Sequence, residues 1–333
     1  MKVTVFSTKP YDEQFLRRHN QASNHELVFI ENRLTSETAA LAEGSPAICA
    51  FVNDELNART LAKLAAGGTR FVALRCAGFN NVDLAAAEAH CIQVARVPAY
   101  SPHAVAEHAV ALLLCLNRHV HKAYNRVREG NFSIDGLMGE DLHGKTVGVV
   151  GTGTIGAIFA GIMRGFGCEV LAYDVVENPD CLKAGVRYVS QEELFSRSNV
   201  ISLHCPLMPQ THHLIDGHTL AGMRDGVFII NTSRGALIDT EAATAAIKSG
   251  RIGGLALDVY EEESELFFDD HSDHVIQDDV FMRLTTFPNV LITGHQAFFT
   301  NEAMTHISMT TFSNLADFEN GRDCPNLVKA KAN

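Results

Sequence analysis

One stretch of the chain decides its fold class: residues 146–156, which read TVGVVGTGTIG. Its first five residues form a β-branched run that is typical of a buried strand. The run leads directly into the pattern G-x-G-x-x-G at Gly151, Gly153 and Gly156. In a strand–turn–helix unit each of these glycines has one role. The first allows a tight turn, the second lets a pyrophosphate approach the backbone, and the third lets the helix pack on the strand. The stretch therefore predicts a dinucleotide-binding unit.

The next expected strand indicates which dinucleotide this unit takes. It ends in Asp174, 18 residues after Gly156. An acid at this position accepts hydrogen bonds from the adenosine ribose diol. Residues 175–177 (Val-Val-Glu) contain no Arg or Lys that could neutralise a 2′-phosphate. We therefore expect NAD rather than NADP.

Short β-branched runs alternate with helical stretches along the whole chain, which is typical of parallel sheets with crossover helices. The first series of expected strands is Val3–Ser7, Glu26–Glu31, Ala47–Val52, Phe71–Arg75 and Gln93–Val97. The second series is Thr146–Gly151, Glu169–Asp174, Asn199–Cys205, Val227–Ser233, Gly253–Tyr260 and Val290–Gly294. Ser101 and Pro102 predict the start of a connector helix that runs to about Val120, and a last helix runs to about Glu319. We expect Glu261–Asn289 to be irregular.

Composition narrows the classes of function. The 333 residues are more than one hydrophobic core usually serves, and 27 Lys+Arg against 39 Asp+Glu give a net charge of −12. This charge disfavours partners held through phosphates, namely nucleic acid and anionic membrane surfaces. The longest clean apolar run, Ala109–Leu116, is too short to span a bilayer, and Met1–Ser7 does not look like a signal peptide. Eight scattered cysteines without a C-x-x-C pattern fit free thiols, so we expect a cytoplasmic α/β protein.

Three strands of the second series end in residues suited to the reduction of a keto acid. Arg234 comes directly after one strand, and a guanidinium can hold a carboxylate through two hydrogen bonds. His295 follows another, and an imidazole can exchange a proton near neutral pH. A third brings Asp258 and the acidic run Glu261–Glu263 to the same edge, where ligands bind in open α/β sheets. Taken singly, each residue also has a structural interpretation: a surface arginine, a packed histidine or a solvated acidic loop.

These residues lie in stretches that resemble the D-2-hydroxyacid dehydrogenase family. The stretches are 75–83 (RCAGFNNVD), 97–102 (VPAYSP), 231–235 (NTSRG), 258–263 (DVYEEE) and 294–298 (GHQAF). The resemblance covers essentially the whole chain and is strongest to the fermentative NAD-dependent D-lactate dehydrogenases. It implies two doubly wound parallel-sheet domains. A Rossmann cofactor domain (101–299) would be inserted into a flavodoxin-like substrate domain (1–100 plus 300–333), with the active site in a cleft whose closure expels water.

The resemblance also implies roles for individual residues. Arg234 would bind the substrate carboxylate and carbonyl, His295 would be the acid/base, and Glu263 would be the carboxylate partner of His295. Tyr100 and the Ala77-Gly78 backbone would line the substrate pocket. Asp258 is implied near the nicotinamide. The positions that match cofactor-contacting residues of the family are Gly151, Gly153, Thr154, Ile155, Gly156, Asp174, Cys205, Pro206, Thr211, Thr232, Ser233 and Asp258.

The implied reaction is the reversible reduction of pyruvate to D-lactate by NADH. One alternative is the same chemistry on a bulkier 2-keto acid, such as phenylpyruvate or 2-ketoisocaproate. Another is an NAD-sensing binding protein in which catalysis is incidental.

The remaining features are expected to serve structure and assembly. We expect no metal, because this chemistry needs no Lewis acid, and the Asp- and His-containing stretch 267–274 suits a solvated loop. The chain should form a homodimer or homotetramer, with the helix after Ser101 as a candidate interface. Four histidines of that region are expected to serve packing, caps or the interface: His103, His108, His119 and His121.

Overall fold

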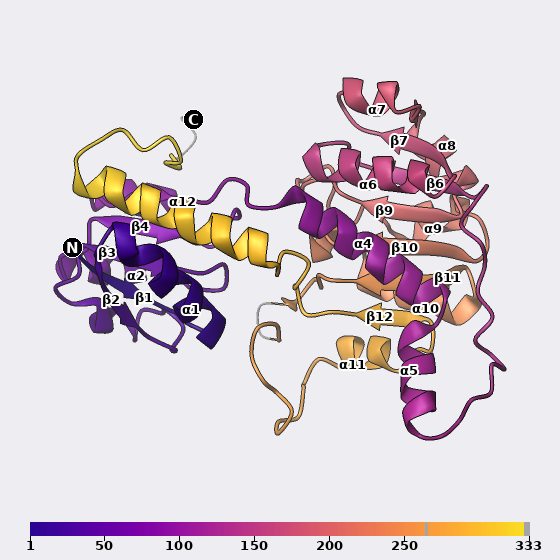
Figure 1. Ribbon diagram of the computed structural model, residues 1–333, viewed down its shortest axis with the longest axis horizontal. Coiled ribbons are helices and arrows are strands. Elements are labelled where there is room, and N and C mark those ends of the chain that lie inside the picture. Colours follow the sequence, from indigo (N-terminus) through magenta and orange to yellow (C-terminus); the bar gives the residue numbers. More distant parts are fainter. Residues whose placement is uncertain (264–265, 330–333) are drawn as a thin grey trace. The chain divides into compact units, whose positions relative to one another are not determined.

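A computed structural model of the chain describes residues 1–263 and 266–329. The chain divides into two compact units, one formed by Met1–Ser101 with the chain from Phe299 onward, the other by Pro102–Phe298 (Figure 1). Each unit carries one sheet whose paired strands all run parallel, so the predicted α/β class is confirmed. Among the described residues, no helix is both long and apolar enough to cross a membrane.

The first unit is built on a five-stranded sheet. Its strands are β1 (Lys2–Val5), β2 (Glu26–Phe29), β3 (Ala47–Ala50), β4 (Phe71–Leu74) and β5 (Gln93–Ala95), in the order β2-β1-β3-β4-β5. Helices α1 (Pro10–His19) and α12 (Asn301–Glu319) pack on one face, and α2 (Ala58–Ala66) and α3 (Leu84–Ala89) pack on the other. Short 3₁₀ turns, η1 (Asn20–Ala22) and η2 (Ala39–Ala42), belong to its loops. Since both faces are covered, β3 and β4 are buried at every residue.

The second unit is built on a seven-stranded sheet. Its strands are β6 (Thr146–Val150), β7 (Glu169–Tyr173), β8 (Arg187–Tyr188), β9 (Val200–Leu203), β10 (Val227–Asn231), β11 (Ile252–Leu257) and β12 (Val290–Ile292). They lie in the order β12-β11-β10-β9-β6-β7-β8. The chain order reverses between β6 and β9, which makes a topological switch point where ligands bind beyond the carboxyl ends of the strands. This is the predicted Rossmann arrangement.

Helices cover both faces of this second sheet as well. One face carries α4 (Pro102–Asn117), α6 (Thr154–Gly165) and α7 (Pro179–Lys183). The other carries α8 (Gln191–Arg197), α9 (Gly217–Gly222), α10 (Thr240–Ser249) and α11 (Asp279–Thr285). The 3₁₀ turn η3 (Gly235–Leu237) follows β10, whereas α5 (Val120–Arg128) buries none of its residues.

The structure departs from the sequence prediction at β8, which the second series of expected strands does not include, and in two further segments. The connector helix ends at Asn117, and a left-handed His119 (φ 50°) separates it from α5. The amide of Asn117 binds the backbone of Glu140, donating to its carbonyl (2.7 Å) and accepting from its N–H (3.1 Å). The expectation of an entirely irregular segment over 261–289 was wrong, because it contains α11. Asp278 caps that helix by accepting from the N–H of Phe281.

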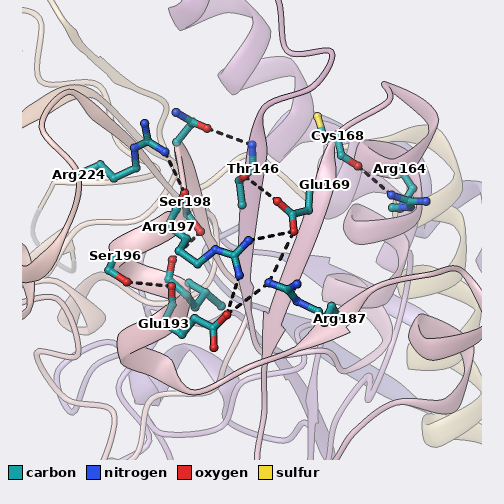
Figure 2. Close-up of polar contacts among 12 residues, drawn as sticks. Thr146, Arg164, Cys168, Glu169, Arg187, Glu193, Ser196, Arg197, Ser198 and Arg224 are labelled. Carbon is teal, nitrogen blue, oxygen red and sulfur yellow. Dashed lines mark hydrogen bonds and ion pairs between the residues drawn. The ribbon is translucent and has the colours of Figure 1, made fainter.

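Exposed ion pairs connect β7 and β8 to α8 (Figure 2). Glu169 Oε1 lies 3.2 Å from Nη2 of Arg197 and 3.6 Å from Nη2 of Arg187. Glu193 Oε1 lies 2.7 Å from Nη1 of Arg197 and 3.3 Å from Nη2 of Arg187. Thr146 Oγ1 donates to the second oxygen of Glu169. Each exposed pair contributes at most about 1 kcal/mol, so the network adds little to the stability of this sheet edge.

Our first prediction concerns His204, which follows β9. Its ring packs on Phe159, Nε2 lies 2.9 Å from Ser202 Oγ, and burial lowers its pKa to about 3. Below about pH 6.5 the unfolded chain binds a proton at this position and the folded chain does not. The free energy of unfolding therefore decreases as the pH is lowered. Between about pH 6.5 and pH 5, we expect the free energy of unfolding to decrease by about 1–2 kcal/mol less in His204→Asn than in the wild type.

Urea unfolding at a series of pH values measures this slope. The exposed His274 serves as a matched control, and His274→Asn should leave the slope unchanged. Equal slopes for the wild type and both variants would contradict the assignment.

Candidate active site

The glycine-rich turn after β6 forms an open cradle. Gly151 has a positive φ of 91°, and a Cβ there would lie 2.5 Å from the backbone nitrogen of Cys205. A Cβ on Gly156 would lie 1.9 Å from the carbonyl oxygen of Gly151. A Cβ on Gly153 would meet no atom within 4 Å, and no side chain caps the first turn of α6. The space over Gly153 and the N–H groups of that turn fit a pyrophosphate.

Asp174 lies at the carboxyl end of β7 and is anchored to the same turn. Its Oδ2 accepts from the N–H (2.5 Å) and the hydroxyl (3.2 Å) of Thr152, and its Oδ1 accepts from the N–H of Val175 (2.7 Å). These bonds leave lone pairs on a half-buried carboxylate. A fixed carboxylate here suits a ribose diol and repels a 2′-phosphate.

The other predicted cofactor residues follow neighbouring strands of the sheet. Thr154 and Ile155 open α6, whereas Cys205, Pro206 and Thr211 follow β9, and Thr232 and Ser233 follow β10. The hydroxyl of Ser233 donates to the carbonyl of Cys205 (2.7 Å), which ties the last two loops together. Burial raises the pKa of the Cys205 thiol to about 11, so it stays protonated.

The hydroxyl of Thr232 bears on whether the residues at this sheet edge fit a cofactor. Its side-chain oxygen is buried and has no hydrogen-bond partner among the described residues. Such an atom is costly to leave unpaired, so its position at this sheet edge fits a polar group of a bound cofactor. The residues present therefore fit a dinucleotide.

His295 and Glu263 lie in direct contact at the same edge of the sheet. His295 Nδ1 is 2.8 Å from Glu263 Oε1, and the other oxygen of Glu263 accepts from the N–H of Tyr260 (2.9 Å). The two side chains are 23% and 26% exposed, so ligands can reach them. With Nδ1 directed at a carboxylate, Nε2 is the nitrogen that can exchange a proton with a ligand.

Asp258, at the end of β11, holds the loop that carries His295. His295 has a left-handed backbone (φ 52°), and its N–H donates to the carbonyl of Asp258 (2.7 Å). The carboxylate of Asp258 accepts from the N–H groups of Gln296 (2.9 Å) and Ala297 (2.8 Å) and from the hydroxyl of Thr293 (2.5 Å). A left-handed histidine costs about 1–2 kcal/mol, which these bonds offset.

His108 of α4 is the functional contact that the sequence analysis missed. Its Nε2 lies 3.1 Å from Thr293 Oγ1 and 3.4 Å from Asp258 Oδ1. Burial alone would raise the pKa of Asp258, but hydrogen bonds from His108, Thr293 and the two loop amides lower it. The sequence could have indicated that His108 faces inward, because helical spacing places it between Val105 and Leu112 on the buried face of α4.

Arg234 lies in a loop fixed by Asn231 at the end of β10. The buried side-chain amide of Asn231 donates to the carbonyl of Arg234 (2.9 Å) and accepts from the N–H of Ser233 (3.0 Å). The next residue, Gly235, packs so tightly that a Cβ there would lie 2.0 Å from the carbonyl carbon of Tyr260. This loop therefore lies directly against the segment that carries Glu263, with the Arg234 side chain exposed to ligands.

Three predicted substrate residues belong to the other unit. The carbonyl of Tyr100 accepts from His306, that of Ala77 accepts from Arg96 (2.8 Å each), and that of Gly78 accepts from the thiol of Cys76 (3.3 Å). Their contribution to a substrate pocket stays a prediction.

The chain is similar to known proteins of one dehydrogenase family. Residues 110–297 match the NAD binding domain of the D-isomer specific 2-hydroxyacid dehydrogenases. The chain is 52% identical over 326 residues to the D-lactate dehydrogenase of Escherichia coli, with 98% of this chain and 99% of that protein covered. A solved structure of the pyruvate reductase of Chlamydomonas reinhardtii superposes with a TM-score of 0.94 at 45% identity, covering 98% of each chain. A D-2-hydroxyisocaproate dehydrogenase structure superposes with a TM-score of 0.86 at 31% identity, covering 99% of this chain and all of that one.

Our second prediction tests the Asp258 anchor. Asp258→Asn keeps the size of the side chain but offers one acceptor oxygen to two amides and one hydroxyl, so at least one buried donor loses its partner. We expect a loss of about 1–3 kcal/mol in the free energy of unfolding. We also expect a fall in kcat of more than about 10-fold, because His295 loses its fixed position.

Chemical denaturation and steady-state kinetics measure the two effects. The matched control is Asp225→Asn, which alters an 84% exposed carboxylate paired with Arg251 and should change neither quantity. Unchanged kinetics in Asp258→Asn would show that the loop keeps its geometry without the carboxylate.

Proposed function

This chain belongs to the family of D-isomer specific 2-hydroxyacid dehydrogenases, and we propose that it reduces pyruvate reversibly to D-lactate with NADH. The observation that carries the proposal is the His295–Glu263 pair, 2.8 Å apart, on the edge that also carries the Arg234 loop and the dinucleotide cradle. Relatives named for lactate and for pyruvate, at 52% and 45% identity, support this substrate.

NAD is the cofactor, and when bound it supplies or accepts the hydride. We propose that the backbone at Gly151 and Gly153 and the first turn of α6 hold its pyrophosphate. Asp174 would accept hydrogen bonds from its ribose diol, and the unpaired Thr232 hydroxyl would bind a further polar group.

In the proposed mechanism, Arg234 positions the substrate. A planar guanidinium can bind the carboxylate of a 2-keto acid through two parallel hydrogen bonds, which fixes the orientation of the adjacent carbonyl. Its exposed side chain on a rigid loop supports this role, because the Asn231 hydrogen bonds hold the loop and leave the guanidinium accessible.

His295 moves the proton. In the direction of reduction, Nε2 of the imidazolium donates a proton to the keto oxygen, and in the direction of oxidation the neutral Nε2 takes it back from the hydroxyl. Nδ1–H stays hydrogen-bonded to Glu263 throughout, so the carboxylate stabilises the imidazolium and fixes the tautomer. Because Glu263 is itself held by the N–H of Tyr260, the pair keeps its orientation.

We infer the size of the substrate's side chain from the resemblance to known dehydrogenases. The substrate-lining role of Tyr100, Ala77 and Gly78 is inferred in the same way. A D-2-hydroxyisocaproate dehydrogenase is similar at a lower identity, 31%, which keeps a bulkier 2-keto acid as the second candidate. NADH consumption with pyruvate, phenylpyruvate and 2-ketoisocaproate separates the two, and we expect the highest kcat/KM for pyruvate. A higher kcat/KM for a bulky acid would change the substrate, and NADH binding without turnover would favour an NAD-sensing protein.

Our third prediction concerns His295. We expect His295→Gln to lower kcat/KM by about 10²–10⁴-fold, because no other group replaces the proton donor. NADH affinity, measured by quenching or transfer of nicotinamide fluorescence, should stay within about 3-fold of the wild type, because the cradle is unchanged. His274→Gln controls for the loss of a histidine elsewhere, and normal turnover in His295→Gln would refute the mechanism.

We also propose that the chain forms a homo-oligomer through α5 and the segment that follows it, residues 120–138. This surface exposes large apolar side chains: Tyr124 (61%), Val127 (52%), Phe132 (76%), Ile134 (81%) and Met138 (90%). A soluble protein rarely leaves so many neighbouring apolar side chains in water, so a second copy is the expected cover. A cytoplasmic location is supported by the eight cysteines, none of which forms a disulfide among the described residues.

The fourth prediction tests this assembly. We expect the wild type to elute as a dimer or tetramer and the Ile134→Asp/Met138→Asp variant as a smaller species in size-exclusion chromatography with light scattering. Val275, 81% exposed on another surface, gives the control Val275→Asp, which should keep the wild-type mass. A monomeric wild type would refute the proposal.

A further inference from the structure

Apart from the His295–Glu263 pair, three side chains of types that can ligate a metal ion lie close together. They are His212 and His213, in the loop before α9, and Glu261, in the segment after β11. One ligand atom from each residue lies within 4.8 Å of the others, and His213 Nε2 is 2.5 Å from Glu261 Oε1. From this cluster we infer a binding site for a divalent transition-metal ion of the zinc class.

The backbone gathers the two imidazoles on one side of the loop. Adjacent side chains of an extended segment point to opposite faces. Here His213 has a left-handed backbone (φ 49°), and the two rings stack with their centroids 4.0 Å apart. The conformation is held from outside, because the N–H of His213 donates to the carbonyl of Ala236 (2.8 Å).

The charges of the cluster favour a cation over a simple ion pair. Each of the two stacked imidazoles can offer a nitrogen lone pair beside the carboxylate of Glu261. An ion pair between His213 and Glu261 alone would not involve His212, whose ring stacks on that of His213. A bound cation would accept electron pairs from both rings and from the carboxylate.

Glu261 is oriented as a metal-bound carboxylate is. Its Oε2 accepts from the hydroxyl of Thr240 (3.0 Å), which leaves Oε1 directed at the histidines. Hydrogen bonds of this kind orient ligating carboxylates in metal sites. Glu263, the partner of His295, lies outside the cluster, so the acid–base pair keeps both of its members when an ion binds.

The donor set selects the class of ion. Two imidazole nitrogens and one carboxylate oxygen match the ligands of Zn²⁺, Co²⁺ and Ni²⁺, with a fourth position left for water. Mg²⁺ and Ca²⁺ prefer oxygen ligands only, so they should not compete. His212 is exposed and the other two residues are half-buried, so an ion can enter from solvent.

The test is a Zn²⁺ titration of tag-free full-length protein, freed of metal with a chelator and followed by calorimetry. We expect one ion per chain, and we expect His212→Gln and His213→Gln each to weaken its binding by at least about 10-fold. The His271→Gln/His274→Gln variant removes a different pair of histidines and should bind Zn²⁺ as the wild type does. Millimolar Mg²⁺ should leave the titration unchanged, because Mg²⁺ prefers oxygen ligands.

Further readouts separate binding from catalysis and from folding. Co²⁺ in the site should give the visible absorption of a tetrahedral complex in the wild type and not in His212→Gln. With chelator present, His212→Gln should keep the wild-type kcat/KM, because this exposed side chain takes no part in the proposed reaction. Wild-type Zn²⁺ affinity in both single variants, or loss of the ion only in the His271/His274 variant, would overturn the inference.

Discussion

The candidate active site depends on one buried charge. Asp258 is fully buried, and a lone carboxylate in such a place would be strongly destabilising. Its oxygens instead receive two loop amides and the hydroxyl of Thr293, with His108 beside them. The same bonds hold the left-handed backbone of His295, so the free energy that keeps Asp258 ionised also fixes the proposed proton donor. Removing the charge would therefore disturb stability and catalysis together.

Sheet order then determines which groups meet. Because β10, β11 and β12 are neighbours, the loops that carry Arg234, Asp258 and His295 emerge side by side. The cofactor cradle follows β6 on the far side of β9, at the switch point. One edge of one parallel sheet thus carries both the proposed dinucleotide cradle and the proposed proton-transfer residues. The hydrogen bond from Ser233 to Cys205 connects the loop after β10 to the loop after β9.

Local sequence patterns could predict the parts of the fold that depend on neighbours in the chain. The strand, the glycine turn and Asp174 lie within 30 residues, and periodicity is enough to predict them. The contact of His108 with Thr293 spans 185 residues, and the helix period shows only that His108 faces inward. The end of α4 before His119 and the start of α11 involve side-chain hydrogen bonds of Asn117 and Asp278, which a hydrophobic pattern does not indicate. The resemblance to known dehydrogenases pointed to Glu263, a choice that spacing alone left open.

The acidic run Glu261–Glu263 shows why composition could not resolve the site. Glu263 contacts His295, Glu261 contacts His213 and Thr240, and Glu262 is exposed. Three identical side chains in sequence thus face three different environments, because successive residues of a turn point in different directions. Glu261 and Glu263 are also separated by only one residue in a turn that Gly235 packs against. The turn that directs Glu261 toward His213 therefore also directs Glu263 toward His295.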